Sequence, residues 1–250
     1  MSGHSKWSTI KRKKAKTDAQ KGRIFTRLIK EITIAARTGG GDENANPTLR
    51  TAILAAKAAN MPAANIDRAI KRGTGELPGV VYETVTYEGY GPGGTALMIE
   101  VLTDNKNRTV AEIRHILSRH NGNLGESGCV SWNFEKKGVI QVNSTQISEE
   151  QLLELVLESG ADDLRREDDI FEIIANPNSF ENAKTILKDH NIEVESAEVT
   201  MHPKTTIKVD VKEAEQMLKL MDELEEQDDV NNIYSNVDID DEILKELEQS

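Results

Sequence analysis

Residues 138–201 read GVIQVNSTQISEEQLLELVLESGADDLRREDDIFEIIANPNSFENAKTILKDHNIEVESAEVTM, and two kinds of apolar pattern alternate along them. Short runs rich in Val and Ile predict strands, whereas longer segments with apolar residues three and four apart predict helices. The expected strands are residues 138–142, 163–166, 170–174 and 193–201, and the expected helices are residues 148–158 and 177–190. This β-α-β-β-α-β order is that of a ferredoxin-like domain.

The segments on either side of this domain predict a second α/β domain that is interrupted by it. Upstream, the expected strands are residues 81–88, 95–102 and 129–134, and the expected helix is residues 107–120. Thr109 and Glu112 have the spacing of a capping box at the start of this helix. Downstream, the expected elements are strands at residues 205–209 and 232–237 and a helix at residues 211–226. Two separate half-sheets would leave open edges, so we expect the two segments to form one domain.

The beginning of the chain predicts a small helical domain. From Ile24 onward, apolar residues recur at the spacing of one helical face until a run of three glycines at residues 39–41. Asn46 and Pro47 are suited to the N-cap and first position of a second helix, and Met61-Pro62 begins a third. The expected fold class is therefore α+β with three domains, an N-terminal three-helix domain and two α/β domains, of which the third is inserted into the second.

The expected division of the chain follows from these patterns. It consists of a flexible basic arm at residues 1–22, a helical domain at 23–76, a discontinuous α/β domain at 77–135 and 204–238, an inserted ferredoxin-like domain at 136–203, and an acidic tail at 239–250.

Charge is distributed very unevenly along the chain. The formal net charge is −12, but residues 1–76 carry 16 Lys and Arg against six Asp and Glu. The remaining residues, 77–250, carry 15 basic and 37 acidic residues. A polyanion would attract the basic head and repel the acidic body, so the head is the expected site of contact with nucleic acid.

The basic residues of the head are the candidate nucleic-acid contacts, because Lys and Arg neutralise phosphates whatever the base sequence. An arm with little to bury can fold into an RNA groove on binding. Trp7 can stack on a base or instead anchor the arm on the helical domain, and His4 can meet a phosphate or a base edge. The candidate contacts are His4, Lys6, Trp7, Lys11, Arg12, Lys13, Lys14, Lys16, Lys21, Arg23, Arg27, Lys30, Arg68, Lys71 and Arg72.

Nothing in the sequence indicates catalysis or a cofactor. The five histidines lack metal-site spacing, and the single cysteine, Cys129, is expected to be buried and inert in a strand. Gly89, Gly91 and Gly94 satisfy G-x-G-x-x-G, but they separate two expected strands, which indicates a hairpin loop rather than a dinucleotide site. No apolar run is long enough to span a membrane. We expect a cytoplasmic protein that is not an enzyme, with no cofactor, metal, small-molecule substrate or membrane partner.

A series of motifs in the first half of the chain resembles the YebC family. They are Ser2-Gly3-His4-Ser5-Lys6-Trp7, Lys21-Gly22-Arg23-Ile24-Phe25-Thr26, Gly39-Gly40-Gly41-Asp42, Ala59-Asn60-Met61-Pro62, Ile70-Lys71-Arg72-Gly73-Thr74-Gly75, Tyr87-Glu88-Gly89-Tyr90-Gly91-Pro92-Gly93-Gly94, Leu102-Thr103-Asp104-Asn105, Asn107-Arg108-Thr109 and Phe134-Glu135-Lys136-Lys137-Gly138. After residue 138 the chain matches mainly in pattern and length. Because the match begins at residue 2, we expect a bacterial, cytoplasmic member without a mitochondrial transit peptide. Cys129 departs from the small residue, such as Ser, that the family leads us to expect.

The resemblance implies a helical N-terminal domain followed by two α/β domains, and a role in gene expression. Members of the family are described as DNA-binding transcriptional regulators. Others resemble the mitochondrial translational activator of cytochrome c oxidase, or are implicated in relieving ribosomes stalled at proline runs. The residues carried over by the matching motifs are chiefly Gly3, His4, Lys6, Trp7, Lys71 and Arg72.

The target of the basic head is open between DNA and ribosomal RNA. The second and third helices are joined by a short connection, as in a helix-turn-helix, yet the third offers few polar side chains to read bases. This favours RNA or the ribosome slightly, while the regulator description of the family keeps DNA open. The alternative is a protein-binding adaptor whose acidic α/β body docks a basic partner.

Overall fold

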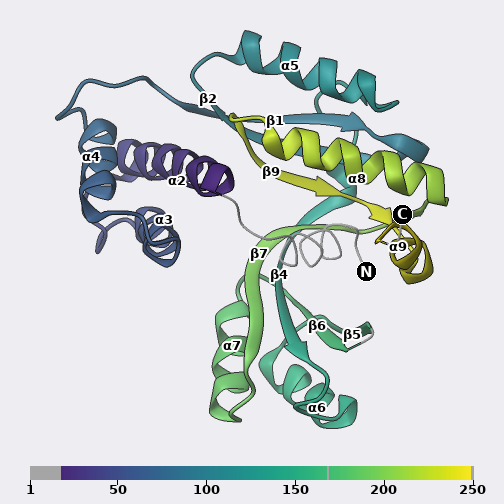
Figure 1. The fold of residues 1–250 in the computed structure, drawn as a ribbon. Coiled ribbons are helices and arrows are strands. Elements are labelled where there is room, and N and C mark those ends of the chain that lie inside the picture. Colours follow the sequence, from purple (N-terminus) through teal and green to yellow (C-terminus); the bar gives the residue numbers. More distant parts are fainter. Residues whose placement is uncertain (1–17, 168, 249–250) are drawn as a thin grey trace. The chain divides into compact units, whose positions relative to one another are not determined.

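The computed structural model describes residues 18–167 and 169–248, which divide into two compact units. One unit is Ser131–Thr206, and the chain before and after it forms the other. Helices and strands are combined in both units, with a helical region first, so the predicted α+β class is confirmed (Figure 1). Because the helical region and the flanking α/β segments share one unit, their separation into two domains stays a prediction.

The unit Ser131–Thr206 contains the ferredoxin-like order that the sequence predicts. Its elements are β4 (Phe134–Asn143), α6 (Glu149–Ser159), β5 (Asp163–Glu167), β6 (Ile170–Ala175), α7 (Phe180–Asp189) and β7 (Val194–Pro203). The strands form one antiparallel sheet in the order β5-β6-β4-β7. Ile140, Phe171 and Ile173 of this sheet pack with Leu152 and Leu187 of the helices. Ser148 caps α6, and Gly160 ends it in a left-handed conformation.

The α/β part of the other unit is built from segments far apart in the sequence. Its sheet has the order β3-β1-β2-β9, in which β9 (Val230–Ser235) pairs with β2 (Ala96–Thr103). The remaining strands are β1 (Glu83–Tyr90) and β3 (Asn123–Leu124), and the helices are α5 (Lys106–Arg119) and α8 (Val211–Glu226). One face of β2, with Leu97 and Ile99, forms a core with Ile113 of α5 and Met217 of α8. The pairing of β9 with β2 therefore joins the two ends of the interrupted segment.

The glycine run between β1 and β2 is a hairpin loop, as predicted. It contains a short 3₁₀ turn, Pro92–Gly94, and β1 and β2 pair as antiparallel neighbours on either side of it. Gly93 and Gly94 have φ values of 68° and 72°, which side chains rarely tolerate.

The strand expected at residues 129–134 is wrong except at its last residue, Phe134. The main-chain N–H groups of Gly128 and Val130 donate to the carboxylate of Glu88, at 2.7 and 2.8 Å, so they are satisfied without a strand partner. A 3₁₀ turn, Ser131–Asn133, follows, and β4 begins at Phe134. Cys129 is thus half-buried in a turn rather than buried in a strand.

Two other expectations about local structure need correction, and a further helix is found near the end of the chain. Asn105, not Thr109, caps α5, because its side chain accepts from the Arg108 N–H. The strand expected at residues 205–209 is β8 (Ile207–Lys208), which pairs with β10 (Val237–Asp238) in a separate two-stranded sheet. Much of the acidic tail is helix α9 (Asp241–Glu248), since Ile243, Leu244 and Leu247 form an apolar side that packs on the core around β2.

The helical region consists of α2 (Asp18–Gly39), α3 (Pro47–Ala58) and α4 (Ala63–Gly73). Helix α2 begins six residues before the expected Ile24, so residues 18–22 are helical rather than part of the arm. Asn46 caps α3 as predicted, with its Oδ1 accepting from the Leu49 N–H at 3.0 Å. Its Nδ2 donates to the Ala35 carbonyl of α2 at 2.8 Å, so one buried side chain both starts α3 and ties it to α2.

A buried cluster of charged groups connects α2 to the α/β part of the same unit. The Lys30 ammonium of α2 lies 2.7 Å from Oδ1 of Asp229, which directly precedes β9. The other oxygen of Asp229 lies 2.6 Å from the Arg108 guanidinium and accepts from the Thr109 hydroxyl at 2.7 Å. Lys30 and Asp229 are 7% and 5% exposed, so water screens their attraction little.

The environment of Asp229 strongly favours its ionised form. Burial by itself would raise the pKa of this carboxyl, but the hydrogen bonds from Lys30, Arg108 and Thr109 outweigh burial and lower the pKa from 3.8 to about 2. The same contact raises the pKa of Arg108. Asp229 is therefore ionised at neutral pH, and its ionised form depends on these three partners.

We expect Asp229→Asn to lower the free energy of unfolding of this unit by about 3–5 kcal/mol, because it leaves the Lys30 ammonium buried without a counter-charge. Urea denaturation of the full chain measures the change. The matched control is Asp67→Asn, which breaks the exposed Asp67–Lys71 pair of α4 and should cost less than about 0.5 kcal/mol. Equal effects of the two substitutions would contradict a structural role for the buried cluster.

The low pKa of Asp229 also predicts how stability depends on pH. A carboxyl whose folded-state pKa lies below its unfolded value stabilises the fold above the unfolded pKa, near 3.8, and loses this contribution as pH falls toward about 2. The loss should be at most about 2 kcal/mol. Urea midpoints between pH 5 and pH 2 would show it as a slope that Asp229→Asn flattens, whereas an unchanged slope would mean that other carboxyls control acid unfolding.

Candidate nucleic-acid interface

The predicted contacts in the arm lie outside the described residues. They are His4, Lys6, Trp7, Lys11, Arg12, Lys13, Lys14 and Lys16. Lys21 belongs to the first turns of α2. The structure therefore describes the candidate interface only at the seven remaining basic residues, which lie on α2 and α4.

Three of the four predicted contacts on α2 bind the α/β part of their own unit. Arg23, Arg27 and Lys30 are spaced by four and three residues, which places them on one side of the helix. Arg23 lies 3.4 Å from the Glu226 carboxylate, the Arg27 guanidinium donates to the Glu225 carbonyl, and Lys30 reaches Asp229. Arg23 and Arg27 thus bind the last turn of α8, and Lys30 binds Asp229 in the connection between α8 and β9.

Burial changes what these side chains can do. Lys30 is enclosed and ion-paired, so it cannot reach a phosphate in this conformation, and we remove it from the predicted contacts. Burial is also the largest influence on Arg27, whose pKa it lowers, and its Nε has no hydrogen-bond partner. No local pattern in the sequence indicates these contacts, because their partners, Glu225 and Asp229, lie 198 and 199 residues further along the chain.

Helix α4 carries the predicted contacts that face solvent. Ile66, Ala69 and Gly73 are buried, so the opposite side of the helix is exposed, with Arg68 and Arg72 one turn apart. Lys71 lies 2.8 Å from Asp67 on the same helix and is partly neutralised by it. In the part of the chain that the structure describes, Arg68 and Arg72 form no ion pair and are available to phosphates.

One exposed basic residue of the helical region was missed by the sequence reasoning. Lys57 lies in the last turn of α3, is exposed, and forms no ion pair among residues 18–167 and 169–248. The absence of Asp and Glu from α3 was the available signal. Arg50, also exposed on α3, is instead held by the main chain, because its guanidinium donates to the carbonyls of Glu43 and Asn44.

The connection between α3 and α4 is short, as in a helix-turn-helix motif. Asn60 adopts a left-handed conformation with φ of 60°, and Met61 is buried beneath it. However, the exposed side of α4 also carries Asp67, next to Arg68 and paired with Lys71, and a carboxylate there would repel the phosphates that flank a DNA groove. The geometry does not favour α4 as a helix that reads bases.

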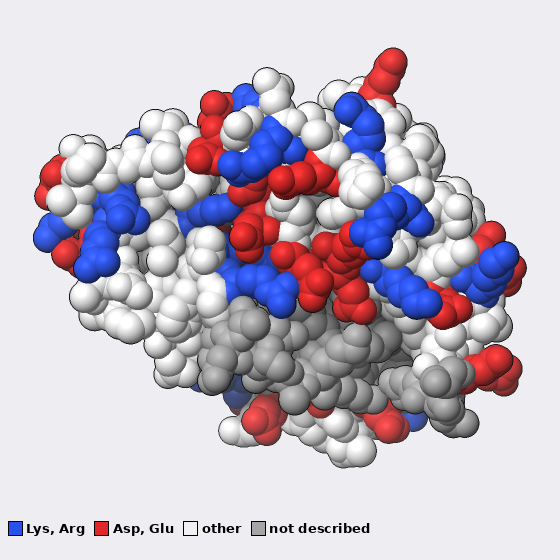
Figure 2. All heavy atoms as spheres, turned by 45° about the horizontal axis from the view of Figure 1, so that its top comes forward, with Lys and Arg blue, Asp and Glu red and all other residues white. Residues whose placement is uncertain are grey.

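Basic side chains do not form an uninterrupted surface on the described residues that Figure 2 displays. Lys and Arg alternate with Asp and Glu over the face in view. Ion pairs of the described residues include Arg119 with Glu223 and Lys106 with Glu83. Much of the positive charge of the described chain is therefore compensated locally, which leaves few cations for an external polyanion.

The described residues contain no group of three or more His, Cys, Asp or Glu side chains placed to hold a metal ion. Burial raises the pKa of the Cys129 thiol, so it is protonated rather than an activated nucleophile at neutral pH. Among the described helices, none has the length and apolar character that a bilayer span requires.

Comparisons with known proteins agree with the motifs and with the fold. A family model described as "TACO1/YebC protein N-terminal domain" matches residues 5–76, and one described as "TACO1/YebC second and third domain" matches residues 82–237. Proteins named "Probable transcriptional regulatory protein" from Syntrophobacter fumaroxidans and Syntrophus aciditrophicus are 56% and 58% identical over 248 residues, which is 99% of this chain and 100% and 99% of theirs.

A solved structure of another protein is similar to this chain in fold and in sequence. The crystal structure of a conserved hypothetical protein from Aquifex aeolicus is 48% identical to this chain and covers 93% of it, with 96% of its own chain aligned and a TM-score of 0.78. Family models that match most of the chain, and relatives that are similar over nearly its full length, confirm the expected resemblance. The chain belongs to the TACO1/YebC family.

Proposed function

We propose that this protein is a nucleic-acid-binding regulator of gene expression. The observation that carries the proposal is the positive charge of the first 76 residues, which contain 16 Lys and Arg but only six Asp and Glu. The remainder of the chain is strongly acidic. The names of its relatives, probable transcriptional regulatory proteins, support a regulatory role. We propose no catalytic step.

The proposed contact combines the arm with the exposed residues of the helical region. Residues 1–17 hold six Lys and Arg, and Arg68, Arg72 and Lys57 are the exposed cations of α4 and α3. These side chains would neutralise phosphates and release counterions, which gives salt-sensitive binding with little preference for sequence. His4 and Trp7 would add stacking or edge contacts in the arm.

The polyanion that fits this arrangement better is RNA, as in a ribosome-associated translation factor that relieves stalling at proline runs. Helix α4 offers two unpaired arginines and an acidic residue, which is little for base readout in a DNA groove. An irregular RNA surface needs phosphate contacts and shape more than base readout. DNA-binding transcriptional regulation is the competing version, and the names of the relatives favour it.

We expect removal of residues 2–17 to abolish most binding to a polyanion. The deletion ends before Asp18, where α2 begins, so it spares the helix. Ribosome co-sedimentation across a salt series, beside binding to random duplex DNA, measures the effect. Six lost phosphate contacts should reduce the slope of log affinity against log salt by up to about 5 on duplex DNA.

The outcomes separate the versions of the proposal. Salt-sensitive, arm-dependent ribosome binding with weak DNA binding would favour the translation factor. Tight binding to particular DNA fragments, well above random ones, would favour the transcriptional regulator. If the deleted protein kept its partner with unchanged affinity, the acidic body would be the binding surface and the protein would be an adaptor.

The double substitution Arg68→Gln with Arg72→Gln tests whether the helical region contacts the nucleic acid. We expect affinity to fall by about tenfold for all nucleic-acid sequences alike, and the salt slope to fall by about 2, because both side chains are proposed to touch phosphates. Arg119→Gln, which removes an exposed arginine of α5, is the control and should leave binding unchanged. An equal loss in the control would indicate a general charge effect instead.

A further inference from the structure

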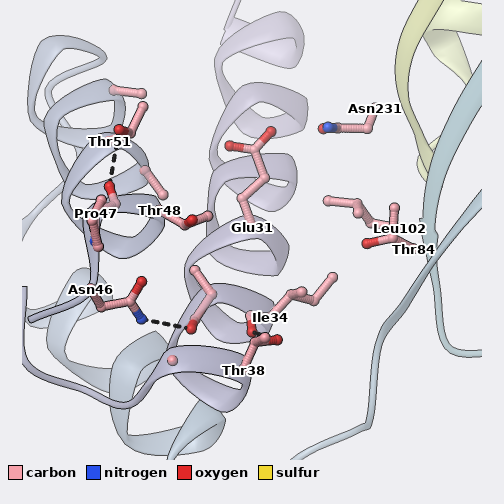
Figure 3. A pocket seen from close by; sticks show the side chains of 14 residues that line it. Glu31, Ile34, Thr38, Asn46, Pro47, Thr48, Thr51, Thr84, Leu102 and Asn231 are labelled. Atoms are coloured by element: carbon pink, nitrogen blue, oxygen red, sulfur yellow. Dashed lines mark hydrogen bonds between the residues drawn. The ribbon is translucent and has the colours of Figure 1, made fainter. Parts of the chain in front are cut away.

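A cavity of about 650 Å³ lies within the larger unit, between the helical region and the α/β sheet. Helix α2 forms one wall, α3 with its cap residue Asn46 forms the second, and single residues of β1, β2 and β9 form the third (Figure 3). This volume is in the range of pockets that hold small organic molecules. None of the predicted nucleic-acid contacts lines it.

The lining is uncharged except at one place. Ile34, Ala35, Ala52 and Leu102 supply apolar surface, and most of the other lining residues are Thr or Asn. Among the 14 lining residues, all in the described part of the chain, Glu31 alone is ionisable. Figure 3 shows Glu31 on α2 between Thr48 of α3 and the strand residues.

A β-bulge places a second polar group opposite Glu31. In the pairing of β9 with β2, Asn232 lies opposite Glu100 and Val230 lies opposite Val101, so Asn231 is an extra residue without a partner in the register. A bulge of this kind redirects a side chain. In Figure 3 the amide of Asn231 is directed toward α2 and Glu31. The irregularity of the strand thus supplies the cavity with an amide.

The charge of Glu31 is poorly compensated where it stands. Burial raises the pKa of this carboxyl, while hydrogen bonding to Asn231 and the nearby Arg27 act in the opposite direction. Arg27 does not line the cavity, and its guanidinium donates to the Glu225 carbonyl. Glu100, close by, adds further negative charge. A cation inside the cavity would supply the missing compensation.

We propose that this cavity binds an aliphatic ammonium group, with the charged end at Glu31 and Asn231 and an apolar stem against the alanines and Leu102. The ammonium would donate to the carboxylate of Glu31 and to the amide oxygen of Asn231. Both a free alkylamine and the side chain of a lysine in another protein present this chemistry. The site is separate from the proposed nucleic-acid contacts and does not depend on them.

The test is a titration of the full-length protein with hexylamine, followed by NMR of the alanine and leucine methyl groups. We expect saturable shifts at Ala35, Ala52 and Leu102, and much weaker binding of 1-hexanol, which has the same stem without the charge. Nα-acetyl-lysine amide, compared with Nα-acetyl-norleucine amide, distinguishes the two sources of the ammonium. Binding of hexylamine alone assigns the site to a free amine, and equal binding of the lysine compound assigns it to a protein side chain.

Two variants make the proposal falsifiable. Glu31→Gln should weaken hexylamine binding at least about tenfold, because a charge-assisted contact is lost. The control Glu43→Gln removes an exposed carboxylate from the same helical region, outside the cavity, and should change nothing. Ala55→Leu keeps Glu31 but fills part of the cavity, and it should also weaken binding.

Three results would overturn the proposal. The first is equal binding of hexylamine and 1-hexanol, which would mean an apolar void without preference for a cation. The second is unchanged hexylamine affinity in Glu31→Gln. The third is the absence of any saturable shift below about 10 mM, which corresponds to an interaction too weak for a built site.

Discussion

The attraction between Lys30 and Asp229 connects helix α2 to the segment that completes the sheet β3-β1-β2-β9. Asp229 directly precedes β9, the strand that returns after the inserted unit and pairs with β2. The same carboxylate holds Arg108 and Thr109 at the start of α5. One buried anion thus fixes α2, α5 and the entry to β9 together, and the cavity that we propose as an ammonium site lies beside this junction.

The contacts of α2 with α8 and Asp229 also reduce the positive charge that the helical region can offer to another molecule. Three cations of α2, spaced along one side of the helix, bind the C-terminal turn of α8 and Asp229. Intramolecular pairing therefore consumes part of the basic charge that the sequence suggested for a polyanion. The exposed cations of α3 and α4, with the arm, are the ones left for an external partner.

Local patterns in the sequence predicted most elements because their causes are local. Asn46 caps α3 through its own third neighbour, and the apolar spacing of residues 211–226 fixes the bounds of α8. The predictions failed where a distant group intervened. Glu88 satisfies the main chain near Cys129 and removes the expected strand there, and Asp229 engages Thr109, which resembled a helix cap.

The sequence by itself determined the element order, the family and the concentration of positive charge in the first 76 residues, because these depend on neighbours along the chain. Only the tertiary structure decided which charges are compensated and where a cavity forms. Lys30 and Asp229 are 199 residues apart, and Glu31 faces Asn231 only because β9 bulges as it joins β2. Interactions across such separations depend on the packing of the folded chain, for which no local pattern is a substitute.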